Sequence, residues 1–273
     1  MSDDGGVGLQ ARLRAGRRMF EALLVWSAMA VVQATEPDAD ALDAQVKELY
    51  GAGRHAEAEA LARQSLDIRR EALGPRHPDV ALSLNNLAGL LHAQGDYPAA
   101  RPLFEESLDI RREALGPRHV DVAQSLNNLA MLLQAQGDYP AARPLYAESL
   151  DIWREALGPR HPDVAQSLNN LAWLLHAQGD YLAARPLCAE SLDILREALG
   201  PRHPDVAKTL NNLAVLLQAQ GNYPAARPLY AESLDIWREA VGPRHPHVAT
   251  APGRRRAECI RAFWTWPEVI VPL

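Results

Sequence analysis

The chain has 273 residues, of which 48% are apolar, 23% charged and 6% aromatic, with 2 cysteines and a formal net charge of −6. This composition excludes a collagen-like or intrinsically disordered chain, and the negative charge supplies no overall basic field for nucleic acid. Two cysteines cannot build a disulfide framework or a four-cysteine zinc site. No apolar run reaches the ~18 residues of a membrane-spanning helix, so we expect no integral membrane span.

The first 34 residues differ in composition from the rest of the chain. Four arginines between positions 12 and 18 precede an uncharged segment, residues 22–32, and a small residue, Ala34, follows it. This order fits an export signal cleaved after Ala34, which predicts an exported or periplasmic protein. The alternatives are an uncleaved amphipathic helix and a leader read from a wrong start position, and without a signal we expect a cytoplasmic protein.

Beyond this leader the sequence is dominated by a repeat of 42 residues. The string Leu/Val-Gly-Pro-Arg-His recurs five times at that spacing, and residues 116–157 match residues 158–199 at 36 of 42 positions. Such a period is typical of stacked units that bury their apolar faces against one another. We assign a degenerate first unit to 35–77, four further units to 78–119, 120–161, 162–203 and 204–245, and a divergent tail to 246–273.

Each unit has the pattern of two helices. In the unit 78–119, the first helix begins at Pro78 and ends before Gly95, and Asp96 caps a second helix over residues 97–115. The first helix carries an apolar stripe at helical spacing, formed by Val80, Leu84, Leu87, Ala88 and Leu91. Pro102 lies near the first turn of the second helix, where we expect a local bend rather than a break.

The short turns between these helices require antiparallel packing. A leading pair spans about residues 38–73, where Leu42, Val46 and Leu49 occupy the core positions of Leu84, Ala88 and Leu91. The sequence therefore predicts an all-α protein, an α-solenoid of about ten helices in tandem antiparallel pairs.

The run HPDVA-x-S/T-LNNLA-x-LL-x-AQG-D/N-Y, followed by AARPL and ESLDI, resembles tetratricopeptide repeats of the 42-residue, kinesin-light-chain-like type. The resemblance covers roughly residues 38–250. It implies a right-handed superhelix whose concave surface is lined by the first helix of each pair and binds a peptide segment of a partner protein. The heptad coiled coil of kinesin light chains is missing, so pairing with kinesin is not implied.

Because the units are nearly identical, their differences are informative. In the first helix these fall at Leu82/Gln124/Gln166/Lys208, Gly89/Met131/Trp173/Val215 and His92/Gln134/His176/Gln218. They share one face with the first asparagine of LNNLA, which in the resembled family faces ligand. The predicted peptide-binding residues are therefore Asn85, His92, Gln124, Asn127, Met131, Gln134, Gln166, Asn169, Trp173, His176, Lys208, Asn211, Val215 and Gln218.

The asparagines and Trp173 also allow a purely structural interpretation. The first asparagines could hydrogen-bond only to the adjacent unit, and for the second ones, Asn86, Asn128, Asn170 and Asn212, we expect that structural role. Trp173 is either an apolar anchor for a ligand or a variant left exposed by duplication.

Several features that suggest chemistry have simpler interpretations. The histidines at 77, 119, 161, 203 and 245 recur once per unit, so we expect turn residues and no metal site. Cys188 stands where other units have Phe or Tyr, so it is expected in the core. The charges along 105–113 are interpreted as a solvated helix face with charge pairs along the helix. No phosphate-binding loop or nucleophile elbow is present, so we expect neither enzymatic activity nor a cofactor.

The repeat pattern stops after Thr250. The aromatic and apolar residues of the tail either cover the last helix pair, as terminal units require, or belong to a truncated array. The favoured function is a non-catalytic scaffold for protein–protein interaction. The alternatives are a regulatory or sensor arm of a larger signalling protein and an array that self-associates through its open C-terminal end.

Overall fold

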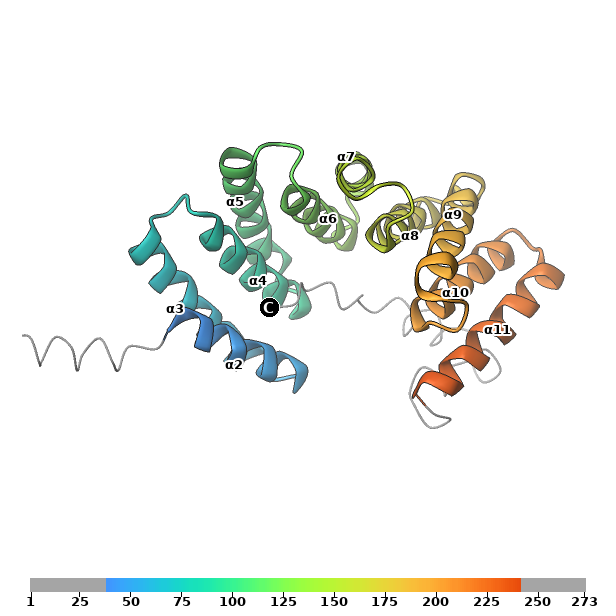
Figure 1. Ribbon diagram of the computed structural model, residues 1–273, viewed down its shortest axis with the longest axis horizontal. Coiled ribbons are helices and arrows are strands. Elements are labelled where there is room, and N and C mark those ends of the chain that lie inside the picture. The colour runs from blue at the N-terminus through green and yellow to red at the C-terminus, as the bar shows by residue number, and fades with distance from the viewer. Residues whose placement is uncertain (1–37, 242–273) are drawn as a thin grey trace, which may run out of the picture.

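The computed structural model describes residues 38–241, which form ten helices and contain no strand (Figure 1). The helices are α2 (Ala39–Gly51), α3 (His55–Leu73), α4 (Pro78–Ala93), α5 (Tyr97–Leu115), α6 (Val120–Ala135), α7 (Tyr139–Leu157), α8 (Pro162–Ala177), α9 (Tyr181–Leu199), α10 (Pro204–Ala219) and α11 (Tyr223–Val241). The predicted all-α solenoid of helix pairs is confirmed. The predicted leader (1–34) and tail (246–273) lie outside the described residues.

Each first helix from α4 to α10 begins at the histidine of the Gly-Pro-Arg-His turn. His119 is the N-cap of α6, and its Nδ1 accepts a hydrogen bond of 3.2 Å from the backbone N–H of Asp121. His77, His161 and His203 cap α4, α8 and α10 in the same way. These N–H groups have no partner within a helix, so a side-chain acceptor at this position stabilises the helix start. The recurring histidines are therefore helix caps.

The second helices begin and end as their sequences predict. Asp96 caps α5 by accepting from the backbone N–H of Ala99 at 3.2 Å, and α5 continues unbroken through Pro102. At the other end, Gly116 has a φ of +87°, a conformation that side chains other than glycine rarely adopt. This glycine lets the chain leave α5 and turn directly into the next unit.

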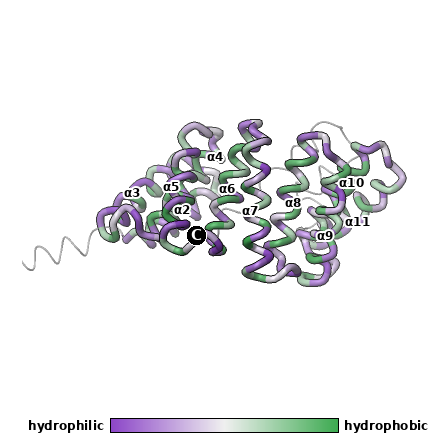
Figure 2. The backbone as a smooth tube through the Cα atoms, turned by 90° about the horizontal axis from the view of Figure 1, so that it is seen from above, coloured by the Kyte–Doolittle hydropathy of each residue, from purple (hydrophilic) through white to green (hydrophobic). Residues whose placement is uncertain are grey.

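The core follows the apolar stripes of both helices. In α4, Val80, Leu84 and Ala88 are completely buried, and Phe104 and Leu108 of α5 lie in the same cluster. Hydrophobic and hydrophilic residues alternate along every helix (Figure 2), as expected of amphipathic helices that cover one another. In the leading pair, Leu42 and Val46 are buried at the predicted positions. No helix among residues 38–241 is long and apolar enough to cross a bilayer.

A buried serine joins the two helices of every pair. Ser149 of α7 donates its hydroxyl to the backbone carbonyl of Ala123 in α6 at 2.7 Å, and neither the serine nor the alanine is exposed. The same bond links Ser65, Ser107, Ser191 and Ser233 to the alanine 26 residues before each of them. The repeated serine of ESLDI is thus a structural residue that fixes the register of the pair.

Successive pairs stack so that the array curves. Each second helix lies against the first helix of the next pair, and first helices also lie against one another, α4 on α6, α6 on α8 and α8 on α10. The first helices form the inner side of the resulting arc and the second helices the outer side (Figure 1). A surface on the first helices that is left uncovered therefore faces the inside of the arc.

Ion pairs connect successive second helices along the outer side. Arg112 of α5 pairs with Glu148 of α7 at 2.8 Å, and Arg70–Glu106, Arg154–Glu190 and Arg196–Glu232 repeat this contact. A second series joins the turn arginines to the next unit, as in Arg118–Glu155. The interpretation of residues 105–113 as a solvated face is therefore wrong in part. Arg101–Glu105 is a pair along one helix, but Glu106, Arg112 and Glu113 form ion pairs across the junction between units.

Substitution of one histidine cap tests the account of the first helices. His161→Ala is expected to lower the free energy of unfolding by about 1 kcal/mol, because the N–H of Asp163 loses its acceptor. His161→Asn replaces the Nδ1 acceptor by a side-chain oxygen that can accept from the same N–H and should retain most of that stability. Urea unfolding followed by circular dichroism measures both variants, and equal losses would contradict a capping role.

Candidate functional site

The first helices leave one narrow face uncovered. Between Val122 and Gln134 of α6, every residue is buried except Gln124, Met131 and Gln134 itself. Within the first helices, these are the main positions at which the units differ in sequence. Most residues that vary in the first helices are thus ones that solvent reaches, and these helices form the inner side of the arc.

Ten of the predicted binding residues form this inner face, the name we give to the half-exposed side chains of the first helices. They are His92, Gln124, Met131, Gln134, Gln166, Trp173, His176, Lys208, Val215 and Gln218, all partly exposed. The four predicted asparagines lie beneath them and are 2–8% exposed: Asn85, Asn127, Asn169 and Asn211. The structure places all fourteen on consecutive first helices, and their contact with a ligand stays a prediction.

The buried asparagines link adjacent first helices. Asn85 of α4 accepts a hydrogen bond of 2.9 Å from the amide of Asn128 in α6, and Asn127 accepts one of 2.8 Å from Asn170 in α8. The first asparagine of one unit and the second asparagine of the next therefore form a pair. For Asn128 and Asn170, this is the inter-repeat hydrogen bond that the sequence predicts for the second asparagine.

Two junctions depart from this pairing. Asn86 of α4 is 4% exposed, and its side-chain amide has no hydrogen-bond partner among residues 38–241. Position 43 of the leading unit holds an aspartate that binds Arg69 instead. At the junction of α8 and α10, Asn169 donates to Thr209 at 2.8 Å. The expected bond is therefore absent for Asn86, and α8 and α10 are joined by a different one.

The glutamines of the inner face are matched to the core beneath them. Gln134 accepts a hydrogen bond of 3.0 Å from the hydroxyl of Tyr146, and Gln218 accepts the same bond from Tyr230. In the other two units the glutamine is replaced by histidine, and the tyrosine by a residue without a hydroxyl, giving the pairs His92/Phe104 and His176/Cys188. Variation at the position of Gln134 thus follows the residue beneath it in the second helix. The sequence analysis attributed this variation to ligand recognition alone.

Aromatic rings gather where the inner face contains histidine. His176 stacks on Trp173, with ring centroids 4.7 Å apart and planes 15° apart, and its other neighbour is Tyr181 at 5.3 Å. His92 and Tyr97 make the same contact in the earlier unit. Burial lowers the pKa of His92 to about 4, and burial also lowers the pKa of His176. Both imidazoles are therefore neutral at physiological pH.

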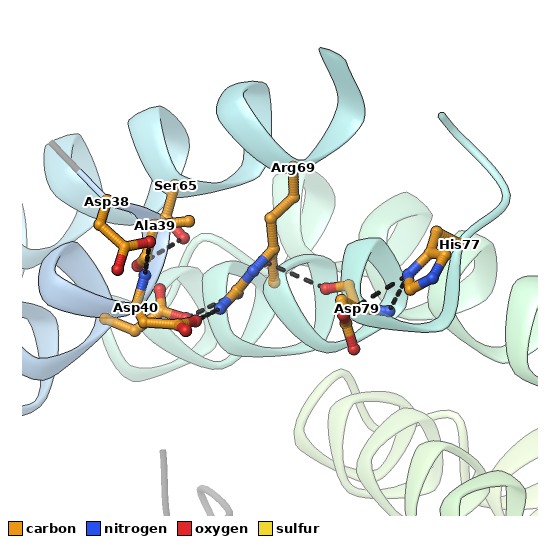
Figure 3. Close-up of polar contacts among 9 residues, drawn as sticks. Asp38, Ala39, Asp40, Ser65, Arg69, His77 and Asp79 are labelled. Carbon is orange, nitrogen blue, oxygen red and sulfur yellow. Dashed lines mark hydrogen bonds and ion pairs between the residues drawn. The ribbon is translucent and has the colours of Figure 1, made fainter. Parts of the chain in front are cut away.

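An ionic cluster around the buried Arg69 lies in the N-terminal unit, and the comparison of the repeat units did not find it. Arg69 of α3 donates to Asp40 and Asp43 of α2 and to Ser83 of α4, each at 2.6 Å (Figure 3). Burial opposes the charge of Arg69, but the hydrogen bonds and charges of the two aspartates outweigh it and raise its pKa. The cluster ties α2 and α3 to the first regular unit.

Arg111 occupies the same place one unit later. It belongs to the charged run interpreted above as solvated, yet it is only 4% exposed. Its Nη1 donates to the hydroxyl of Ser125 and to the backbone carbonyl of Asp121, each at 3.0 Å. No ion pair among residues 38–241 includes it, and burial lowers its pKa although the charge of Asp121 opposes this. The stable burial of a guanidinium could not be inferred from a run of alternating charges.

Candidate metal ligands are not brought together among residues 38–241. Within residues 38–241 no group of three or more histidine, cysteine or acidic side chains could hold a metal ion. Cys188 is 1% exposed, at the core position that the sequence predicts. The capping histidines lie one per unit, each beside an aspartate of its own helix.

The sequence profile of the tetratricopeptide repeat family matches residues 49–113, 83–152, 121–186, 174–238 and 205–251. The chain belongs to the tetratricopeptide repeat family. A search of curated protein sequences gave no significant match.

Crystal structures of other tetratricopeptide repeat proteins resemble this array. A putative kinesin light chain with nearly identical repeats from Podosopora anserina is 25% identical, with a TM-score of 0.64 over 73% of this chain and 94% of that one. BtubC from P. vanneervenii is 24% identical, with a TM-score of 0.66 over 93% and 97%. The apo form of RapI shares the fold at 14% identity, with a TM-score of 0.63 over 87% and 66%. The resemblance to kinesin-light-chain-like repeats is confirmed.

The matched glutamine and tyrosine can be tested as a pair. Tyr146→Phe is expected to cost about 1 kcal/mol of unfolding free energy, because the buried side of Gln134 loses its donor. Gln134→His combined with Tyr146→Phe recreates the pair His92/Phe104 and should cost less than the sum of the two single substitutions. Urea unfolding of the four proteins gives the coupling energy, and strictly additive losses would contradict the pairing.

Cys188 should be unreactive in the folded protein. Burial raises the pKa of its thiol to about 12, so almost no nucleophilic thiolate is present near neutral pH. In a Cys259→Ser background, a chromogenic disulfide reagent should modify Cys188 slowly in buffer and rapidly in urea. Fast modification of the native protein would show that the thiol is accessible.

Proposed function

We propose that this tetratricopeptide repeat protein is a non-catalytic scaffold that binds a peptide segment of a partner protein on its inner face. The observation that carries the proposal is the location of the sequence differences. Among the first helices of the four regular units, most differences fall on the partly exposed face, at the positions of Gln124, Met131 and Gln134. The repeated helices give this surface a constant backbone shape, while its side chains differ from unit to unit. Such a surface is suited to the selective recognition of a peptide.

The inner face combines amide groups with one large apolar group. Gln124, Gln166 and Lys208 offer polar contacts, but a net hydrogen bond contributes only about 1 kcal/mol, whereas association costs an estimated 4–15 kcal/mol. Polar contacts alone would therefore bind weakly. Trp173 is half-exposed and held by stacking on His176, and pre-ordered tryptophans are frequent binding hot spots. We assign Trp173 the role of anchor.

The asparagines act in this proposal chiefly through the shape of the surface. The Asn85–Asn128 and Asn127–Asn170 bonds hold neighbouring first helices in register, which fixes the spacing of the side chains above them. An inner face ordered before binding loses less conformational entropy on binding. The asparagines thereby contribute to affinity even where the ligand touches only the residues above them.

Removal of Trp173 is the direct test of the proposed site. Peptides selected on the intact protein from a displayed random library should bind Trp173→Ala at least about tenfold more weakly. Leu199→Ala, which removes an exposed leucine at the end of α9, is the matched control and should leave affinity unchanged, while Gln134→Ala should have a smaller effect than Trp173→Ala. Titration calorimetry measures each variant. Equal and negligible effects of the Trp173 and Gln134 substitutions would contradict the assignment.

A further inference from the structure

Two units of the array have a buried arginine at the same position of the second helix, Arg69 and Arg111, and in the leading unit its charge is balanced by aspartates. In the leading unit, Arg69 reaches Asp43, which is largely buried, and Asp40, whose side chain is 82% exposed, both on the first helix of the same pair. The carboxylate of Asp40 thus approaches the guanidinium from the solvent side. An arginine of a second helix can therefore be contacted from the inner side of the arc.

The next unit keeps the arginine and lacks both acids. Arg111 is 42 residues after Arg69, and the positions of Asp40 and Asp43 are taken by Leu82 and Asn85. Its hydrogen bonds within residues 38–241 all come from Nη1, and they go to neutral oxygen atoms. Asn85 is itself engaged by Asn128. The charge of Asp121 acts on Arg111, but no ion pair among residues 38–241 includes Arg111, and no carboxylate stands at the place that corresponds to Asp40.

The fold does not require a charge at this position. The three following units have Trp153, Leu195 and Trp237 there, and Leu195 and Trp237 are buried. A buried cation that forms no ion pair is costly, and an apolar residue would remove that cost. The retained guanidinium is therefore best explained by a group that is not part of the described chain.

We propose that Arg111 binds the side-chain carboxylate of an aspartate or glutamate in the bound peptide, at the place that Asp40 occupies beside Arg69. The ligand acid lies over Leu82, between α4 and α6, and completes the cluster that Ser125 and the carbonyl of Asp121 begin. This inference rests on the proposed function, since it names one residue type of the peptide that the inner face recognises. Arginine suits the role because its planar fork can donate two hydrogen bonds to one carboxylate.

Two substitutions borrowed from neighbouring units test the inference. Arg111→Leu introduces the residue found at Leu195, and Leu82→Asp introduces the residue found at Asp40, so each variant copies an arrangement that the fold already accommodates. The first removes the cation, and the second supplies an internal carboxylate that competes with the ligand. Leu82→Asp should also raise the urea midpoint, because it neutralises a buried charge without removing the guanidinium.

The experiment uses the full chain and random linear peptides displayed on phage, whose displayed segments have no free C-terminus. Peptides selected on the unmodified protein should be enriched in aspartate or glutamate at one position, and both variants should lose that enrichment. For a selected peptide made with an amidated C-terminus, replacing its acid by the matching amide should weaken binding about tenfold to the unmodified protein and less than twofold to Arg111→Leu.

The outcomes separate this inference from the proposed function. A library that yields no specific binder contradicts both. Binders that depend on Trp173 but show no acidic preference, or that keep the preference with Arg111→Leu and Leu82→Asp, overturn only the inference. A preference for a free C-terminal carboxylate over a side-chain acid overturns it as well. If Arg111→Leu fails to fold by circular dichroism, Leu82→Asp decides the question alone.

Discussion

Each first helix from α4 to α10 is covered by its own second helix, by the second helix of the preceding pair and by neighbouring first helices. This enclosure leaves one line of side chains exposed to solvent. Between Val122 and Gln134 of α6, only Gln124, Met131 and Gln134 are partly exposed. Residues on the other faces of a first helix pack against these neighbouring helices, so a change in their size or polarity disturbs that packing. The enclosure therefore explains why the first helices are nearly identical and why most of their differences fall on the inner face.

The architecture could be predicted from the sequence because it depends on local signals. Asp96 marks the start of α5 by its side-chain cap and Gly116 marks the end by its positive φ. The stripe from Val80 to Leu91 has a helical period that repeats without a gap. Contacts between units were less accessible. Asn85 and Asn128 are 43 residues apart, and only the crossing of α4 and α6 brings their amides to 2.9 Å.

The sequence predicted the exposed residues of the candidate site, which differ between units, but it did not predict the buried arginine, Arg111. The half-exposed residues around Trp173 differ between units, and that signal is visible in one sequence. Arg111 sits among alternating charges that a solvated helix would also show, so nothing local distinguishes it from Arg112, which reaches Glu148 on the outer side. Comparison of equivalent positions, Arg69 with its two aspartates against Arg111 with Leu82, is the signal that could have found it.

The coupling of position 134 to position 146 bears on how such an array can be rearranged at the level of the gene. Nearly identical segments recombine readily, and an exchange within the turn at residues 136–138 would join a first helix ending in glutamine to a second helix carrying phenylalanine or cysteine, or leave a histidine above the tyrosine. An exchange within the Gly-Pro-Arg-His turn transfers both partners together. A break between pairs therefore preserves the contact between positions 134 and 146, whereas a break within a pair separates the two residues.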